Sequence, residues 1–240
     1  MSQSADIEAF TEAQTQGFRL MNHILKGLDS GISEVQLLEH IEQEAKSFGF
    51  TDWFSRPVIH FDYTMRTRIG PSKNRRLTPL TVVQIHLKPA TEHAYANLGL
   101  SFCLSGNPPP IIAQARELTK ATTTFAAHMK CVGELFVFAR SWANNHRCKL
   151  NNESHIGHQC ISPSQNGWLW PKSARMAALL RRNQIQWYNP KRLNGIYAIQ
   201  PDLSSDGRRA GFAEIIAVTE EGRWALGRNS MDEIGHWELR

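Results

Sequence analysis

Two apolar segments joined by a short polar turn place His86 and Asn97 eleven positions apart, and this spacing constrains the fold more than any other feature. The first segment covers residues 82–89 and the second covers residues 95–102. Apolar runs separated by a few turn residues are typical of a β-hairpin. Because side chains alternate between the two faces of a strand, a hairpin can direct chosen residues toward one cleft. The sequence therefore predicts a hairpin that presents His86 and Asn97 to a common site.

Helices are predicted before this hairpin and strands dominate the end of the chain. Apolar residues recur at helical spacing over residues 6–28. A second helix is expected to begin at Ser33, where Ser33 and Gln36 have the spacing of a capping box. The other expected elements are a strand within 54–63, two helices within 111–145 that divide near 131–133, a helix at 173–182, and strands at 195–200, 211–219 and 223–226.

Length and composition indicate an ordinary globular protein. The chain has 240 residues, enough for one sizeable core, and a net charge of +5. Its basic runs lack the interleaved aromatic residues or motifs of nucleic-acid binding, so no nucleic-acid partner is expected. No apolar run reaches the length of a membrane span and no signal peptide begins the chain, which favours the cytoplasm. The four cysteines are widely spaced, as in a protein with reduced thiols.

The order of these elements resembles the pita-bread metallopeptidase family, which includes methionine aminopeptidase, aminopeptidase P, prolidase and creatinase. The hairpin spacing, the helix start at Ser33 and the segment Ala213–Ile216 carry the resemblance, which runs from about residue 7 to residue 226. It implies an α/β fold with two pseudo-symmetric halves around a curved, mainly antiparallel sheet. Residues 1–240 are expected to form one such domain, without the separate N-terminal domain of aminopeptidase P and creatinase.

The resemblance also implies where a metal site would lie. In the metal-dependent members, two aspartates, a histidine and two glutamates hold a pair of divalent ions. These positions fall, in order, on His86, Asn97, His158, Gln200 and Glu214. Only His158 and Glu214 keep the residue type. A unit charge pair about 4 Å apart is worth roughly 4 kcal/mol even at an effective dielectric constant of ~20. The loss of three carboxylates therefore predicts that the usual dinuclear site is absent.

Further residues are assigned to the same cleft as ligand-binding groups. Arg68 takes the position at which family members have a histidine that contacts the substrate. The second catalytic histidine of the family has no counterpart in the segment after His158. Cys160 is either a nucleophile beside His158 or an inert buried thiol. The expected ligand-binding set is Arg68, His60, Asn97, Gln200 and Trp168.

Two interpretations of the remaining polar residues stay open. Two histidines and one carboxylate can hold a single transition metal, so His86, His158 and Glu214 are candidate catalytic residues and ligands of one Fe, Zn or Mn ion. Alternatively, the histidines are hydrogen-bonded groups in a pocket that has no metal cofactor. The distances between the donors decide between the two.

Three functions are compatible with this sequence. The first is a non-peptidase relative of aminopeptidase P and creatinase that binds or transforms a small amino-acid- or peptide-like ligand. The second is an enzyme with altered chemistry, either a hydrolase that acts on a carbon–nitrogen bond or a mononuclear metal enzyme (hydrolase or oxygenase). The third is a catalytically inactive protein-interaction module. A homodimer is an expectation carried over from the creatinase branch.

Overall fold

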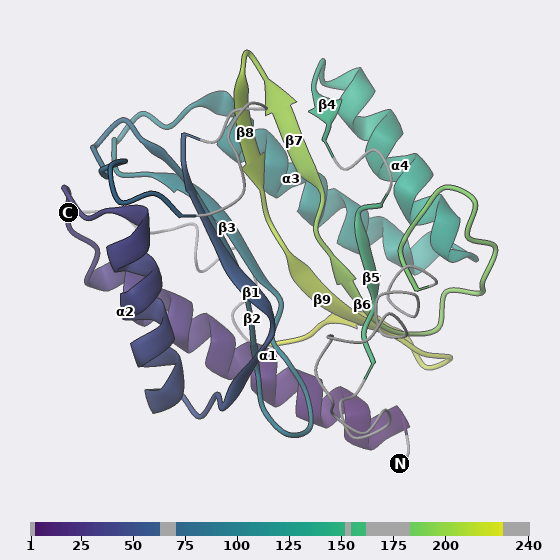
Figure 1. The fold of residues 1–240 in the computed structure, drawn as a ribbon. Coiled ribbons are helices and arrows are strands. Elements are labelled where there is room, and N and C mark those ends of the chain that lie inside the picture. The colour runs from purple at the N-terminus through teal and green to yellow at the C-terminus, as the bar shows by residue number, and fades with distance from the viewer. Residues whose placement is uncertain (1–2, 63–70, 152–154, 162–182, 228–240) are drawn as a thin grey trace.

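Each half of the chain consists of a helix pair followed by antiparallel strands. The computed structural model describes residues 3–62, 71–151, 155–161 and 183–227 (Figure 1). In the N-terminal half, two helices precede a sheet of order β1–β2–β3. These elements are α1 (Gln3–Lys26), α2 (Glu34–Ser47), β1 (Asp52–Phe61), β2 (Val82–Ala90) and β3 (Leu98–Cys103).

The C-terminal half repeats this plan with more strands. Its helices α3 (Pro110–Phe125) and α4 (Val132–Asn145) flank a short 3₁₀ helix, η1 (Ala126–His128). One sheet has the order β10–β9–β6–β5 and the other has the order β4–β7–β8. The strands are β4 (Lys149–Leu150), β5 (Gly157–Gln159), β6 (Gly195–Ile199), β7 (Asp202–Ser205), β8 (Arg208–Gly211), β9 (Glu214–Val218) and β10 (Arg223–Ala225).

The predicted helix start at Ser33 and the hairpin are confirmed, because the signals for them are local, while the helix expected at 6–28 runs from Gln3 to Lys26. Ser33 caps α2, and Gln36 reaches back to the Ser33 amide at 3.0 Å, which completes the capping box. The region 111–145 divides into α3 and α4 with the break before Val132. In Figure 1, α1 and α2 lie beside the sheet of the N-terminal half, while α3 and α4 lie beside β4, β7 and β8. No described helix is long and apolar enough to cross a membrane.

One prediction of a strand is wrong in detail. The expected strand at 211–219 is two elements, because β8 ends at Gly211 and β9 begins at Glu214. Ala213, between them, forms a bridge to Gly99 of β3. The chain therefore changes sheet at Phe212 and Ala213, and the two halves meet at this point. The helix expected at 173–182 lies outside the described residues.

Strand β2 separates the core from the cleft. Val83, Ile85 and Leu87 point into the main hydrophobic core and are completely buried. The alternate residues of β2, which are Gln84, His86 and Lys88, point to the other face. In the register of the sheet, His86 lies opposite Val58 of β1 and Gly99 of β3. The alternation of β2 thus places three polar side chains on the cleft face of a strand whose other face is apolar.

Candidate functional site

The hairpin brings His86 and Asn97 together. The ring nitrogen Nε2 of His86 lies 3.2 Å from Oδ1 of Asn97. Asn97 is completely buried, and its backbone is held by Gln14 of α1, which accepts from the Asn97 amide at 2.9 Å and donates to its carbonyl at 3.3 Å. In the described part of the chain, Nδ2 of Asn97 has no hydrogen-bond partner. Asn97 is therefore fixed in place with one donor unused.

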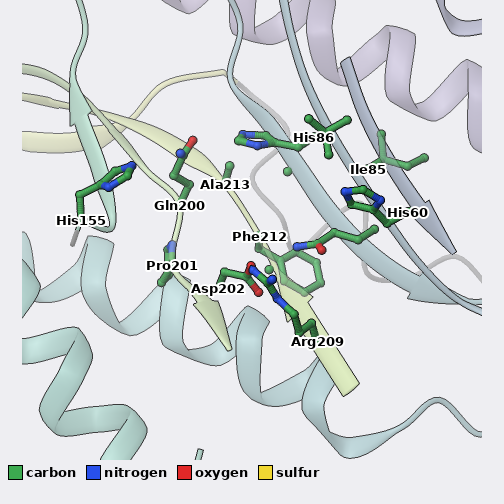
Figure 2. A pocket seen from close by; sticks show the side chains of 14 residues that line it. His60, Ile85, His86, His155, Gln200, Pro201, Asp202, Arg209, Phe212 and Ala213 are labelled. Atoms are coloured by element: carbon green, nitrogen blue, oxygen red, sulfur yellow. The ribbon is translucent and has the colours of Figure 1, made fainter. Parts of the chain in front are cut away.

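His86 is a neutral imidazole at physiological pH. Burial and the nearby positive charge of Lys88 lower its pKa from 6.5 to about 3. Hydrogen bonds with the side chains of Asn97 and Gln200 act in the opposite direction. Figure 2 shows the rings and amides that face the cavity, with Gln200 across from His86. A neutral ring can accept or donate one hydrogen bond, but it carries no charge toward a ligand.

His158 lies deeper and is held by aromatic side chains. It is located in β5 and is buried, and its Nε2 lies 3.1 Å from the hydroxyl oxygen of Tyr95. Its ring is parallel to that of Phe54, with centroids 6.0 Å apart, and Phe54 stacks directly on Tyr95 at 3.9 Å. Burial, followed by the charge of Lys88, keeps the pKa of His158 well below its usual range. His158 is thus neutral and locked in position.

Gln200 and Glu214 are adjacent across two strands. In the pairing of β6 with β9, Ile199 lies opposite Glu214, and Gln200 follows Ile199 directly. The backbone amide of Gln200 donates to the carbonyl of Ile156 at 2.7 Å, and this bond fixes the backbone from which the Gln200 side chain extends. Glu214 is buried. The positions assigned to the fourth and fifth metal ligands are therefore neighbours in space.

These residues do not suit the two divalent ions that the family resemblance implies. Asn97 and Gln200 are neutral amides, His86 is a neutral ring, and Glu214 supplies one carboxylate where four would balance a charge of +4. A buried ammonium, that of Lys88, adds positive charge within electrostatic reach of His86 and His158. Hard divalent ions bind where negative oxygen ligands gather, and this donor set lacks them.

The structure does not assemble the three-donor face considered for a single ion either. Across the described residues, no three His, Cys, Asp or Glu side chains form a group that could hold a metal ion. His86, His158 and Glu214 are all among those residues. Instead of facing a common point, Nε2 of His86 lies beside the side-chain amide of Asn97, and Nε2 of His158 lies beside the Tyr95 hydroxyl.

A cavity of about 280 Å³ opens beside His86, between the two halves of the chain. Figure 2 shows its walls, with His60 and His86 from the N-terminal half and His155, Gln200 and Pro201 from the C-terminal half. A volume of this size suits a small polar molecule. Its lining residues are Val58, His60, Gln84, Ile85, His86, Gly99, His155, Gln200, Pro201, Asp202, Arg209, Gly211, Phe212 and Ala213.

An ion pair that the sequence did not reveal lies at one end of this cavity. Arg209 of β8 and Asp202 of β7 form a short, largely buried salt bridge. Burial raises the pKa of Asp202, while Arg209 and the hydrogen bond from Asn151 lower it. Because the pair is nearly neutral as a unit, it offers a ligand hydrogen-bonding groups without a strong net charge.

Two more neutral histidines line the cavity. Burial, together with Arg75 and Arg209, lowers the pKa of His60 from 6.5 to about 4. Burial and Lys88 lower the pKa of His155. His155 was not among the expected site residues, although it lies three positions before His158. With His86, these rings give the cavity a polar lining that is uncharged near pH 7.

The structure does not place every residue that was expected in the site. Arg68 and Trp168 lie outside the described residues. Cys160 is buried, and burial raises the pKa of its thiol to about 12, which disfavours the nucleophile interpretation. Lys88 and Tyr95 were missed, and the only sequence signal for Lys88 was its position on the same strand face as His86.

No protein-family profile and no curated protein matches this sequence. Solved structures do match. Dipeptidase PepE from Mycobacterium ulcerans superposes with a TM-score of 0.72 at 18% identity, over 94% of this chain and 58% of that one. X-Pro aminopeptidase from Thermotoga maritima gives 0.73 at 14% identity, over 95% and 62%. Methionine aminopeptidase from Thermotoga maritima gives 0.70 at 15% identity, over 94% and 97%.

At these identities the comparisons establish the fold. The chain has the α/β pita-bread architecture, as predicted. It spans about three fifths of the dipeptidase and X-Pro aminopeptidase chains and nearly all of the methionine aminopeptidase chain.

Proposed function

We propose that this chain is a non-peptidase relative of aminopeptidase P and prolidase that binds a small amino-acid- or peptide-like ligand in the cavity between its two halves. The fold it shares with a dipeptidase, an X-Pro aminopeptidase and a methionine aminopeptidase supports this class of ligand. The size of the cavity and its polar walls, in which Asp202 and Arg209 balance each other's charge, are compatible with such a molecule.

One observation carries the proposal, which is the loss of negative charge at the five positions that correspond to metal ligands. Asn97 is completely buried and its Oδ1 faces a neutral histidine, where the family would place a carboxylate between two cations. Glu214 is the only carboxylate of the five. Hydrolysis that depends on a pair of metal ions is therefore not part of the proposed function.

Metal content and peptide hydrolysis test this proposal together. We expect protein purified without added metal to contain less than one equivalent of Fe, Zn or Mn, with the same content in His158→Ala. Alanyl-proline should not be hydrolysed when Mn²⁺ or Zn²⁺ is added, but it should raise the melting temperature. Two tightly held ions with turnover, or a panel of amino acids and dipeptides without any thermal shift, would contradict the proposal.

A reverse substitution gives a matched control. His86→Asp, Asn97→Asp and Gln200→Glu combined with Lys88→Met restore four carboxylates in all and remove the buried ammonium. Since each opposite charge pair at ~4 Å contributes roughly 4 kcal/mol at an effective dielectric constant of ~20, Mn²⁺ affinity should rise at least tenfold over wild type in calorimetry. Equal affinity in the two proteins would mean that charge is not what distinguishes this site.

A further inference from the structure

Lys88 is a buried lysine that forms no ion pair with any other described residue. It lies in β2, two residues after His86 and on the same strand face, and only 9% of it is exposed. Its Nζ lies 5.7 Å from the centroid of the Phe54 ring, a cation–π contact. Among the ion pairs between described residues, Lys88 takes part in none. A buried charge without a counter-ion is unfavourable, so an anion beside Nζ of Lys88 would be stabilised.

Among the described residues, the titratable groups that interact with Lys88 do not compensate its charge. Those within electrostatic reach are three histidines (His86, His155 and His158), whose pKa values are all lowered, and Cys160. Burial raises the pKa of Cys160 to about 12, and Tyr95, which is hydrogen-bonded to Cys160, has a pKa raised well above 10. All of these are therefore neutral near pH 7. Burial lowers the pKa of Lys88 itself from 10.5 to about 8, so about nine tenths of it is still protonated at pH 7.

A second unused donor lies directly across the sheet. The pairing of Leu87 with Leu98, and the bond from the Ala96 amide to the Pro89 carbonyl at 2.9 Å, place Lys88 opposite Asn97. Side chains of directly opposed residues lie on the same face of a sheet, about 5 Å apart at Cβ. Asn97 is completely buried and its Nδ2 is unpartnered within the described part of the chain. A cation and an amide donor are thus side by side and buried. Within the described part of the chain, the cation has no counter-ion and the amide nitrogen has no acceptor.

We propose that Lys88 and Asn97 form the anion-binding end of the site and bind a carboxylate of the ligand. The carboxylate oxygens accept from Nζ of Lys88 and Nδ2 of Asn97, in charge-assisted and neutral hydrogen bonds respectively. Neither Lys88 nor Asn97 lines the cavity itself, but His86 and Gly99, two residues away on each strand, do. A ligand anchored here therefore extends past His86 and Gly99 into the cavity. This inference rests on the small amino-acid- or peptide-like ligand proposed above.

Acetate provides a direct probe that needs no variant. In wild-type protein with ¹³C-labelled lysine, the pKa of Lys88 is followed by NMR without and with acetate. Because acetate binds the charged ammonium, its presence should raise this pKa by about one unit or more, while exposed Lys130 should not change. An unchanged Lys88 pKa at saturating acetate would overturn the inference.

A pair of ligands that differ in one group separates the inference from the proposed function. Wild type should bind alanyl-proline at least tenfold more tightly than its C-terminal amide, and Lys88→Met should bind both alike. Lys88→Arg retains the charge and guards against misfolding of the methionine variant, and Lys130→Met is the matched surface control. If acid and amide bind wild type equally, the inference fails and the proposed function stands. If neither binds while acetate still shifts Lys88, the ligand class fails and the anion site stands.

Discussion

The side chains of His86 and Asn97 meet at 3.2 Å across the β2–β3 hairpin, and both are uncharged. The family resemblance implies metal-binding aspartates at both positions, and here one hydrogen bond joins two uncharged side chains instead. A carboxylate introduced at either position therefore tests whether the site tolerates negative charge.

Asn97→Asp introduces a buried carboxylate beside the His86 ring. We expect the pKa of His86 to rise from about 3, since a nearby negative charge favours the imidazolium form. Desolvation of the carboxylate should lower the free energy of unfolding at pH 7 by about 2 kcal/mol. NMR titration of His86 and urea denaturation measure the two effects. A His86 pKa that stays where it is would show that the introduced carboxylate takes up a proton instead.

Acid should destabilise the protein through His60. Its pKa is lowered from 6.5 to about 4 in the folded chain, so between these values the unfolded chain binds a proton that the folded chain does not. The free energy of unfolding therefore falls as pH drops through this window, by about 2–3 kcal/mol, and is unaffected above it. Urea denaturation from pH 7 to pH 4 should show this slope. His60→Gln should reduce this slope without abolishing it, because the lowered pKa values of His86 and His158 contribute to it as well. An equal slope in both proteins would exclude a contribution from His60.

Glu34 holds the loop that precedes the hairpin. It is completely buried, accepts from the amides of Phe61 and Ser72 at 2.6 Å each, and pairs with Arg75 at 2.9 Å. Glu34→Gln leaves Arg75 without its partner and should lower the free energy of unfolding by about 3 kcal/mol.

Glu39→Gln is the control for this prediction, because Glu39 is exposed on the same helix. Its effect should stay within about 0.5 kcal/mol in the same chemical denaturation experiment. Similar losses in the two variants would contradict a specific role for Glu34.

Gly99 permits the close approach of the two halves. A Cβ at this position would lie 2.6 Å from Cβ of Ala213 and 2.7 Å from its backbone nitrogen. Gly99→Ala should therefore lower the free energy of unfolding by about 2 kcal/mol, and it should also weaken ligand binding because Gly99 and Ala213 line the cavity. Gly106→Ala, with nothing within 4 Å of the added atom, should be neutral in both measurements.

The sequence predicts those parts of the fold whose signals are local. The capping box at Ser33 and Gln36 and the apolar periodicity of α1–α4 depend on neighbours a few positions away, and these elements form as expected. The break between β8 and β9 does not show in the sequence. It arises because Ala213 bridges to Gly99, more than a hundred positions earlier in the chain.

The site is less predictable than the fold for the same reason. His86 and Asn97 are joined by one hairpin, so their spacing predicts that they share a cleft. Lys88 resembles a solvated lysine near a strand end, but in the fold it is buried and its ammonium lies over the Phe54 ring. The Asp202–Arg209 pair needs the register of β7 with β8, which residue types alone do not fix.

The hydroxyl of Ser101 in β3 donates to the Gly211 carbonyl at 3.0 Å and accepts from the Gly211 amide at 2.9 Å, close to the Gly99–Ala213 bridge. These ties join the halves where the cavity lies. Because the walls of this cavity come from both halves, a fragment that contains only one half lacks the site. A ligand in this cavity contacts both halves of the chain, so its binding stabilises the contact between them.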